Sequence, residues 1–322
     1  MKSFVIAKND AGQRLDKFLT KAVPLLPQAL LYKYIRMKRI KLNRKRCEIS
    51  TRLQEGDLLE LYINDEFFEA PSAEEAFFRA PSDITVVYED ENVLLVNKPA
   101  GLIVHEDDKE AFDTLINRIL KYLYEKKEYD PQKENSFVPA LCNRIDRNTS
   151  GIVLAAKNAA ALRVLNQKIK DRELSKKYLC VVHGTMPQKQ ETLTAYLRKD
   201  ADKNQVRVFD RPISDGRTIR TAYKVLAQKG DLSLLKVDLL TGRTHQIRAH
   251  MAHIGHPLLG DSKYGKNRTD RELGYRFQAL CAYEITFSFA TDGECLEYLN
   301  GKTFTLNEVD FAQKLFGYRI KK

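Results

Sequence analysis

Apolar residues recur at helical spacing near the start of the chain. Positions i, i+3, i+4 and i+7 of one stretch are filled by Leu15, Phe18, Leu19 and Ala22. This spacing places four apolar side chains on one face, which predicts an amphipathic helix. A second helix is predicted for residues 27–39, where one face carries Leu31, Tyr34 and Ile35 and the others carry Lys and Arg.

The pattern then changes to that of short strands. Residues 40–49 predict a strand, a basic turn and a further strand. Within residues 56–63, alternate positions are apolar: Leu59, Leu61 and Ile63. Such alternation is typical of a strand with one buried face. Two helices and a few strands predict a small α/β domain over residues 1–64.

A change of composition follows this domain. Residues 65–82 are acidic and contain two prolines, as expected for a linker. The segment also holds four aromatic residues, Phe67, Phe68, Phe77 and Phe78. These apolar side chains predict that the linker docks against a domain.

Residues 83–322 predict a larger domain with more strands than helices. Strands are expected within residues 84–98, 151–157, 176–184 and 232–240. One helix is expected after the capping residue Asn158, and another over residues 242–255 with Gly255 and Pro257 as its stop. Because strands and helices do not alternate regularly, the pattern favours an α+β fold with a mixed sheet.

The charge is concentrated in the first domain. The 322 residues include 54 Lys and Arg against 43 Asp and Glu, a net charge of +11. Residues 1–63 alone hold 14 basic and 6 acidic residues, so most of the excess lies there. A solvated surface is the ordinary explanation, but basic residues near a helix end and a turn favour phosphate binding. The candidate RNA contacts are Lys33, Arg36, Lys38, Arg39, Lys41, Arg44, Lys45 and Arg46.

Cysteine usage and hydropathy indicate a cytoplasmic protein. The five cysteines form no CxxC pair and are odd in number: Cys47, Cys142, Cys180, Cys281 and Cys295. This predicts neither a disulfide framework nor a cysteine zinc site. The first residues do not read as a signal peptide, and no stretch is apolar enough to span a membrane.

The motif NRIDRNTSG at residues 143–151 places Asp146 between Arg144 and Arg147. Two cations in contact with a carboxylate would keep it ionised. Neighbours in an extended segment often point apart, however, so a surface ion pair and a reactive acid both fit this motif.

Four histidines crowd one stretch, His245, His250, His253 and His256. Their spacing contains no HExxH and no intervening carboxylate, so it does not favour a metal site. The glycine pattern contains neither GxGxxG nor GxxxxGK[ST], which disfavours an enzyme with a nucleotide cofactor. We therefore expect neither metal nor cofactor.

Four longer stretches resemble the pseudouridine synthases of the RluA type. They are VNKPAGLIVH at 96–105, NRIDRNTSGIVLAAK at 143–157, SKKYLCVVHG at 175–184 and LLTGRTHQIRAHMAHIGHPLLGDSKYG at 239–265. The resemblance covers nearly all of residues 83–322 and implies a mainly antiparallel mixed sheet. The first domain, from Arg14-Leu15-Asp16 to Gly56-Asp57, resembles the S4-like RNA-binding domain.

This resemblance implies isomerisation of uridine within an RNA chain, without a cofactor. Its catalytic residues fall on Asp146, Tyr178 and Arg248, and the arginine linked to displacing the target base falls on Arg144. Further substrate contacts are expected from Asn143, Arg147, Lys98, Arg243 and His245. Asn143 stands where the family usually has His, so a charged RNA contact there is lost. Lys98 could instead belong to a turn that shapes the pocket.

Ribosomal RNA of the large subunit, or a pre-ribosomal particle, is the expected partner, and transfer RNA is the alternative. We expect a monomer that binds no membrane. Two other classes of function are a non-catalytic ribosome-associated RNA binder and a metal-dependent RNA hydrolase. A binder has no use for Asp146, Tyr178 and Arg248 together, and a hydrolase would lose activity with a chelator.

Overall fold

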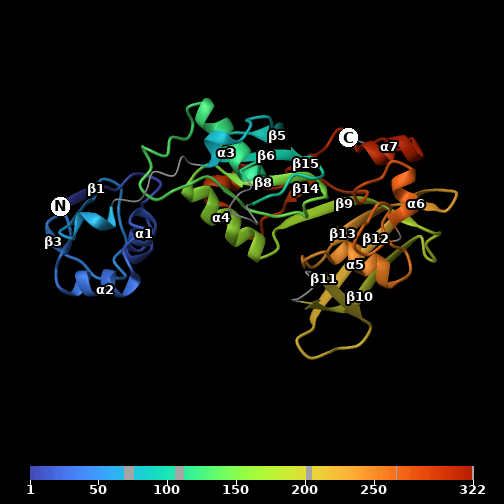
Figure 1. Ribbon diagram of the computed structural model, residues 1–322, viewed down its shortest axis with the longest axis horizontal. Coiled ribbons are helices and arrows are strands. Elements are labelled where there is room, and N and C mark those ends of the chain that lie inside the picture. The colour runs from blue at the N-terminus through green and yellow to red at the C-terminus, as the bar shows by residue number, and fades with distance from the viewer. Residues whose placement is uncertain (69–75, 106–111, 201–204, 266, 321–322) are drawn as a thin grey trace.

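The computed structural model describes residues 1–68, 76–105, 112–200, 205–265 and 267–320. The N-terminal module, residues 1–63, lies at one end of the long axis, and the catalytic body occupies the rest (Figure 1). Each part has its own cluster of buried apolar side chains. None of the described helices is long and apolar enough to cross a bilayer.

Two helices cover a small antiparallel sheet in the N-terminal module. Among the described residues the strand order is β1-β4-β2-β3. The elements are β1 (Lys2–Val5), α1 (Leu15–Ala22), α2 (Gln28–Arg36), β2 (Ile40–Leu42), β3 (Lys45–Arg46) and β4 (Leu58–Leu61). The predicted amphipathic helix is confirmed, because its core face is fully buried at Leu15, Phe18 and Leu19.

The second helix is shorter than predicted. It ends at Arg36 and not at residue 39, because Lys38 adopts a left-handed conformation with φ 58°. The backbone N–H of Arg39 then reaches back to the carbonyl oxygen of Tyr34 at 2.9 Å, which closes the helix end. The two-residue turn between β2 and β3 uses positive φ at both Asn43 and Arg44, as a type I′ hairpin requires.

Three of the four linker aromatics pack against a core, whereas Phe78 is exposed. Phe67, in the short 3-10 helix η1 (Asp65–Phe67), and Phe68 pack against the core of the N-terminal module. Phe77, in η2 (Ala76–Arg79), is buried in the core of the catalytic body. Residues 69–75 of the predicted linker lie outside the described residues.

One large sheet forms the catalytic body. Its described strands follow the order β11-β10-β12-β13-β9-β14-β8-β6-β5, with β15 beside β14 and β7 beside β8. Every pair is antiparallel except β8 and β14, so the predicted mixed, mainly antiparallel sheet is confirmed. The strands are β5 (Thr85–Glu89), β6 (Val93–Lys98), β7 (Ala140–Leu141), β8 (Ser150–Ala156), β9 (Leu174–His183), β10 (Gln190–Asp200), β11 (Gln205–Phe209), β12 (Arg217–Lys229), β13 (Leu232–Leu239), β14 (Leu280–Phe287) and β15 (Thr303–Thr305).

Alternate residues of the central strands belong to two hydrophobic cores on opposite faces of the sheet. In β8, Val153 and Ala155 belong to one core, and Ile152 and Leu154 to the other. The first core is closed by α3 (Leu115–Glu125) and α5 (Gln246–His253), the second by α4 (Ala159–Lys170), the 3-10 helix η3 (Glu294–Leu299) and α7 (Asp310–Phe316). The short α6 (Asn267–Glu272) follows the loop after α5.

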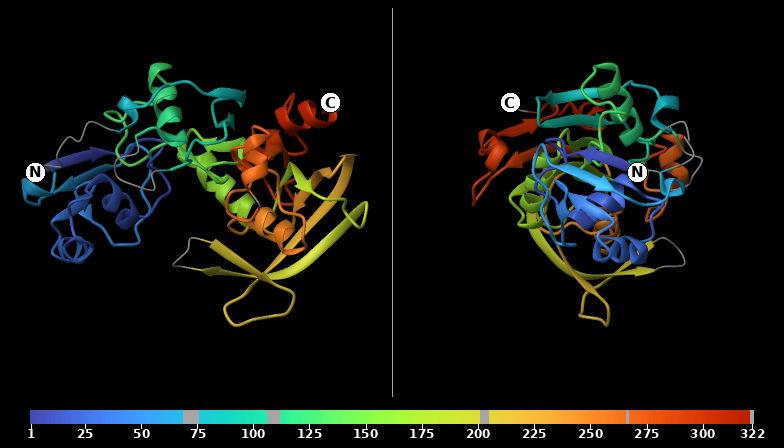
Figure 2. Two further views of the ribbon diagram at one scale, coloured as in Figure 1. Left: turned by 45° about the vertical axis from the view of Figure 1, so that its right-hand side comes forward. Right: turned by 90° about the vertical axis from the view of Figure 1, so that its left-hand side faces the viewer.

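Strands β10, β11 and β12 were not predicted from the sequence. Figure 2 shows the yellow strands of this region as a curved arm that projects from the catalytic body. The arm has a small apolar cluster of its own, made by Ala195, Leu197, Val206, Ile219 and Ala249. It flanks α5, whose Ala249 completes that cluster.

Polar side chains join the N-terminal module to the catalytic body. Asp10 is fully buried and accepts hydrogen bonds from Ser136 Oγ at 2.6 Å and Asn135 Nδ2 at 2.7 Å. Asn9 Nδ2 donates to Glu134 at 2.9 Å, and its Oδ1 accepts the N–H of Ala159 at the start of α4. These contacts hold the module against the body.

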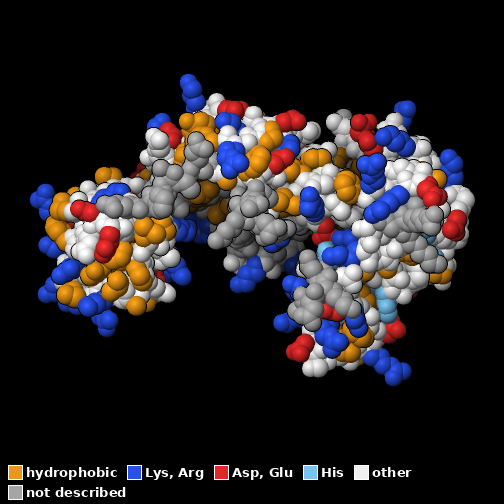
Figure 3. Space-filling model, in the orientation of Figure 1, with side chains coloured by type: hydrophobic (Ala, Val, Ile, Leu, Met, Phe, Trp, Pro, Cys, Tyr) orange, Lys and Arg blue, Asp and Glu red, His pale blue; other side chains and the backbone are white. Residues whose placement is uncertain are grey.

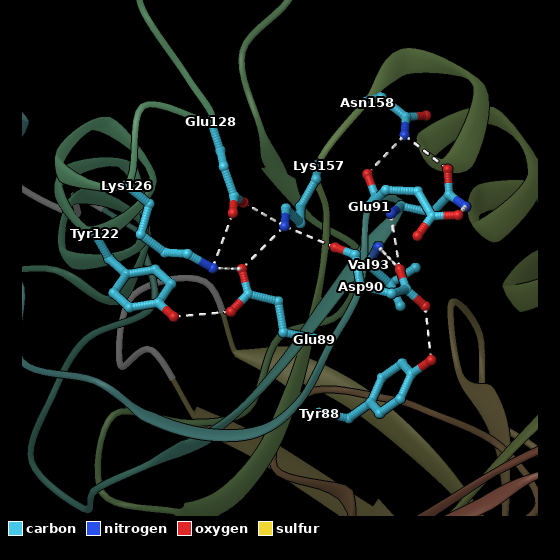
Figure 4. Close-up of polar contacts among 11 residues, drawn as sticks. Tyr88, Glu89, Asp90, Glu91, Val93, Tyr122, Lys126, Glu128, Lys157 and Asn158 are labelled. Carbon is cyan, nitrogen blue, oxygen red and sulfur yellow. Dashed lines mark hydrogen bonds and ion pairs between the residues drawn. The ribbon is translucent and has the colours of Figure 1, made fainter.

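An ion-pair network secures the edge hairpin β5–β6 to α3 and the end of β8 (Figure 4). Glu89 accepts from Lys126 at 2.8 Å, Lys157 at 2.9 Å and Tyr122 at 2.8 Å. Asn158 caps α4 as predicted, because its side chain accepts the N–H of Ala161. These contacts join β5 to α3 and to the end of β8.

Candidate active site

Asp146 lies on the loop that joins β7 to β8. Lys98, at the end of β6, secures this loop, because its fully buried ammonium donates to three carbonyl oxygens at 2.7–2.9 Å, those of Pro99, Leu102 and Arg147. Burial lowers the pKa of Lys98 to about 7, and the charge of Asp146 opposes this shift. The three acceptors use all three ammonium protons. Lys98 thus shapes the loop from inside the protein, as the turn interpretation expects.

Gly151 allows the Asp146 loop to approach the next strand. Its φ is +117°, and a Cβ atom there would lie 2.3 Å from the carbonyl oxygen of Ala282 on β14. Side chains are excluded at such a distance, so only glycine lets β8 and β14 run together at this point.

The two arginines beside Asp146 in the sequence do not bind it. Arg144 is exposed and has no hydrogen bond or ion pair with any other described residue. Arg147 is exposed too, and its Nε donates to the carbonyl oxygen of Gly101 at 3.1 Å. The cation that binds Asp146 comes from α5, where Arg248 Nη1 donates to Asp146 Oδ2 at 2.9 Å.

Arg248 has a second carboxylate partner that the sequence did not indicate. Asp261, fully buried, accepts from Arg248 Nε at 2.7 Å and from Nη2 at 2.9 Å. Burial disfavours the charged guanidinium, but hydrogen bonds and the charges of Asp261 and Asp146 raise the pKa of Arg248 above its ordinary value. No spacing rule identifies Asp261, which follows Gly260 in an irregular loop; its only signal was its place in the fourth motif stretch.

Helix α5 begins later than predicted, so His245 lies just before the helix and not within it. The helix starts at Gln246 and not at residue 242, because His245 has φ 52° and Gln246 Oε1 accepts the N–H of Arg243. His245 Nδ1 lies 2.9 Å from the hydroxyl of Tyr264, and its Nε2 lies 3.9 Å from Asp146 Oδ2. Burial lowers the pKa of His245, and the charge of Asp146 opposes this shift.

Tyr178 stands in the middle of the sheet on β9, between β13 and β14. Its side chain is 7% exposed, and its hydroxyl has no hydrogen bond to another described residue. Burial raises the pKa of the Tyr178 phenol, and the charge of Asp146 raises it further. The Tyr178 phenol is therefore neutral, and its hydroxyl has no partner among the described residues.

Two further substrate contacts predicted from the sequence, Asn143 and Arg243, differ in burial: the first is buried and the second is exposed. Asn143 is buried, and its Oδ1 accepts the backbone N–H of Leu154 at 2.8 Å, so this atom serves the fold. Arg243 is exposed just before α5, and its side chain makes no hydrogen bond or ion pair with the rest of the described chain. RNA contacts from Asn143 and Arg243 stay predictions.

The basic residues of the N-terminal module point to solvent. Seven of the eight predicted RNA contacts are exposed and Lys41 is half-buried. Two of them lie over aromatic rings: Arg39 is 5.6 Å from the ring centre of Tyr34, and Lys41 is 5.1 Å from that of Tyr62. None of the eight has a carboxylate partner within the described residues. This surface is suited to a polyanion.

A notch opens between the central body and the projecting arm (Figure 3). Basic, acidic and histidine side chains gather at its inner end, and basic side chains lie along its border. Among the described residues, no three His, Cys, Asp or Glu side chains are grouped to hold a metal ion. Each of the four clustered histidines has its own partner, for example Thr221 for His250 and Asp210 for His253.

Similarity to known proteins agrees with this geometry. Residues 92–253 match the family model for RNA pseudouridylate synthase. Over 292 residues the chain is 35% identical to an uncharacterized RNA pseudouridine synthase of Mycoplasma genitalium, which covers 88% of each chain. It is 31% identical over 304 residues to ribosomal large subunit pseudouridine synthase C of Escherichia coli, which covers 92% of this chain and 91% of that protein.

The fold of the catalytic body is also found among solved structures. Human RNA pseudouridylate synthase domain containing 1 superimposes with a TM-score of 0.53 at 23% identity, over 75% of this chain and 98% of the human one. Family model and relatives together span the Asp146 loop, β9 and α5. The chain belongs to the RNA pseudouridine synthase family.

Proposed function

We propose that this enzyme isomerises uridine to pseudouridine in ribosomal RNA of the large subunit, with Asp146 as its catalytic carboxylate. The contact between Asp146 and Arg248 is the observation that carries the proposal. A carboxylate that is 26% exposed, bound at one oxygen by a buried guanidinium, keeps its other oxygen available for a substrate. Such an arrangement favours an oriented carboxylate over a surface ion pair.

The reaction requires no group from outside the RNA. The bond between N1 and C1′ breaks, the uracil turns, C5 bonds to C1′, and the proton on C5 is lost while N1 gains one. The Asp146 carboxylate either attacks the nucleoside or stabilises positive charge on the ribose, and in both routes Arg248 orients it. We therefore expect neither metal nor cofactor dependence.

We assign Tyr178 to the displaced uracil. Its flat ring can stack on the base while the base turns, and its hydroxyl can lie near C5, where a proton leaves. A raised pKa keeps the phenol neutral, which suits hydrogen bonding and stacking. His245 and Arg243, at the start of α5, are assigned to substrate binding.

The target uridine must leave any stack before it reaches Asp146. Extraction from a duplex costs about a few kcal/mol of unstacking. We assign Arg144 to this step, because its exposed planar guanidinium can fill the vacated position. Arg147 has a similar exposed position on the same loop.

We infer that the N-terminal module is an S4-like RNA-binding domain. The support is its helix pair, its basic hairpin and its eight cations without carboxylate partners among the described residues. Contacts to phosphates would set the register of the RNA, while the catalytic body selects the uridine. The enzyme is inferred to act in the cytoplasm as a monomer.

The relatives named ribosomal large subunit pseudouridine synthase C support ribosomal RNA as substrate. The test is pseudouridine mapping of total RNA from cells with the gene, without it, and with an Asp146→Asn copy. We expect one or more large-subunit sites to disappear without the gene and not to return with the variant. Loss confined to transfer RNA sites would contradict the proposed substrate, and no loss would contradict the proposed function.

A further inference from the structure

Arg248 is shared between two carboxylates from different parts of the chain. Its Nη1 binds Asp146, whereas Nε and Nη2 bind the two oxygens of Asp261. We propose that Asp261 is a positioning residue, which holds the Arg248 guanidinium so that its last donor edge meets Asp146. This inference rests on the proposed catalytic role of Asp146.

The geometry of the pair leaves Arg248 little freedom. Two parallel hydrogen bonds between a guanidinium and a carboxylate fix the plane of the guanidinium as well as its distance. With Nε and Nη2 both bound to Asp261, rotation about the side chain would break two charge-assisted hydrogen bonds. Asp261 therefore fixes the orientation in which Arg248 Nη1 points toward Asp146.

Asp261 is itself held by the backbone. Its Oδ1 accepts the N–H of Lys263 at 2.8 Å and of Tyr264 at 3.1 Å. Burial disfavours its ionisation, but the hydrogen bonds and charge of Arg248 and these two N–H groups lower the pKa of Asp261. A carboxylate fixed by its own loop is a suitable anchor for the long side chain of Arg248.

Tyr264 completes the surroundings of the guanidinium. The centre of its ring lies 5.3 Å from Arg248 Cζ, within reach of a cation–π contact. Its hydroxyl accepts the N–H of Val206 on β11 at 3.0 Å and meets His245 Nδ1. Through Tyr264 the loop after α5 thus contacts both Arg248 and His245, and His245 in turn lies near Asp146.

Fold stability alone does not account for this arrangement. Arg248 and Asp261 have side-chain exposures of 7% and 0%. Burying such a pair carries a desolvation penalty that apolar side chains of similar volume would avoid. The same loop also has an independent structural anchor, since fully buried Asp270 accepts the N–H of Gly260 at 2.7 Å.

Asp270 provides a matched control for a test of Asp261. Both are fully buried aspartates that bind the same loop, but Asp270 faces His183 at 3.0 Å and makes no hydrogen bond or ion pair with Arg248. Asp261→Asn and Asp270→Asn remove the same charge from the same region. A structural role predicts similar consequences for both variants, whereas a positioning role separates them.

The experiment measures single-turnover release of tritium from uridine C5 in a large-subunit ribosomal RNA transcript, together with RNA affinity and the melting temperature. We expect Asp261→Asn to lower the rate constant by about 10- to 100-fold, as loss of an outer contact does at ligand sites, with RNA affinity unchanged. Asp270→Asn is expected to lower the melting temperature while its rate stays within about threefold of wild type. If Asp261→Asn does not fold, Asp261→Glu provides the test, because it keeps the charge but displaces the guanidinium.

A double-mutant cycle with Arg248→Lys supplies the second measurement. A lysine ammonium cannot make the planar contact with both carboxylates, so the Asp261→Asn substitution should have little further effect in that background. A wild-type rate for Asp261→Asn, an equal loss for Asp270→Asn, or fully additive losses in the cycle would overturn the positioning role. Absence of tritium release by the wild-type enzyme would instead contradict the proposed function itself.

Discussion

The cations of the N-terminal module and those of the active site have opposite surroundings. In the module, seven of the eight predicted RNA contacts, among them Lys33 and Arg44, are exposed, and none of the eight has a carboxylate partner among the described residues. In the catalytic body, Arg248 and Lys98 are buried and use their donors within the protein. The difference teaches that one residue type serves two purposes: unpaired cations attract a polyanion, and paired ones hold catalytic groups in place.

The largest expected effect separates chemistry from binding. Asp146→Asn keeps the size of the side chain but removes its charge, so pseudouridine formation should fall by about 10⁴-fold or more. RNA affinity should stay within about twofold, because phosphates are bound elsewhere. Tritium release and filter binding on the same RNA measure the two quantities. A parallel loss of both would mean that Asp146 serves binding.

The next effect tests a buried cation that holds the Asp146 loop. Lys98→Met leaves three carbonyl oxygens without their donor, so the free energy of unfolding should fall by about 3–5 kcal/mol. Urea denaturation followed by circular dichroism measures this change. Lys229→Met is the control, because that lysine is exposed and donates only to the carbonyl oxygen of Leu315. Equal stability of both variants would show that the Lys98 contacts do not stabilise the loop.

Removal of the exposed cations should change binding and leave folding intact. The triple variant Arg44→Ala, Lys45→Ala and Arg46→Ala should weaken RNA binding by roughly tenfold or more at moderate salt, and should reduce the salt dependence by about one unit of slope per lost phosphate contact. Its free energy of unfolding should change by less than about 0.5 kcal/mol per site. Salt titrations of affinity check the prediction, which an unchanged slope would contradict.

The smallest effect concerns the network at the hairpin β5–β6. Burial opposes ionisation of Glu89, but hydrogen bonds from Lys126, Lys157 and Tyr122 lower its pKa to about 2 from 4.5. Since the folded state holds the carboxylate ionised more strongly, its stabilisation is complete above about pH 4.5 and is lost as the pH falls toward 2.

Unfolding measured between pH 7 and pH 3 tests this contribution. Glu89→Gln should lower the free energy of unfolding at pH 7 by about 1.5–3 kcal/mol, and the difference from wild type should shrink in acid. Glu308→Gln, at an exposed position, is the control. A difference that does not depend on pH would show that Glu89 acts by packing alone.

Strong local periodicity was sufficient for much of the fold. The helix at Leu15–Ala22, the buried strand β8 and the cap at Asn158 follow from residues that are neighbours in the chain. The arm strands were missed, although β12 alternates buried Ile219, Thr221 and Tyr223 with more exposed residues. Its many charged and polar side chains hid an alternation that the periodicity rule could have found.

The sequence by itself determined the family, the mixed sheet and the identity of Asp146, Tyr178 and Arg248 as candidates, because motifs and periodicity are local properties of the chain. Only the tertiary structure decided which cation binds Asp146. Arg144 and Arg147, two and one residues away, point elsewhere, whereas Arg248, 102 residues away, makes the contact. Asp261 likewise acquires its partner only when α5 packs beside the loop that follows it. Side-chain partners between distant segments depend on how helices and strands pack, and no local pattern records that packing.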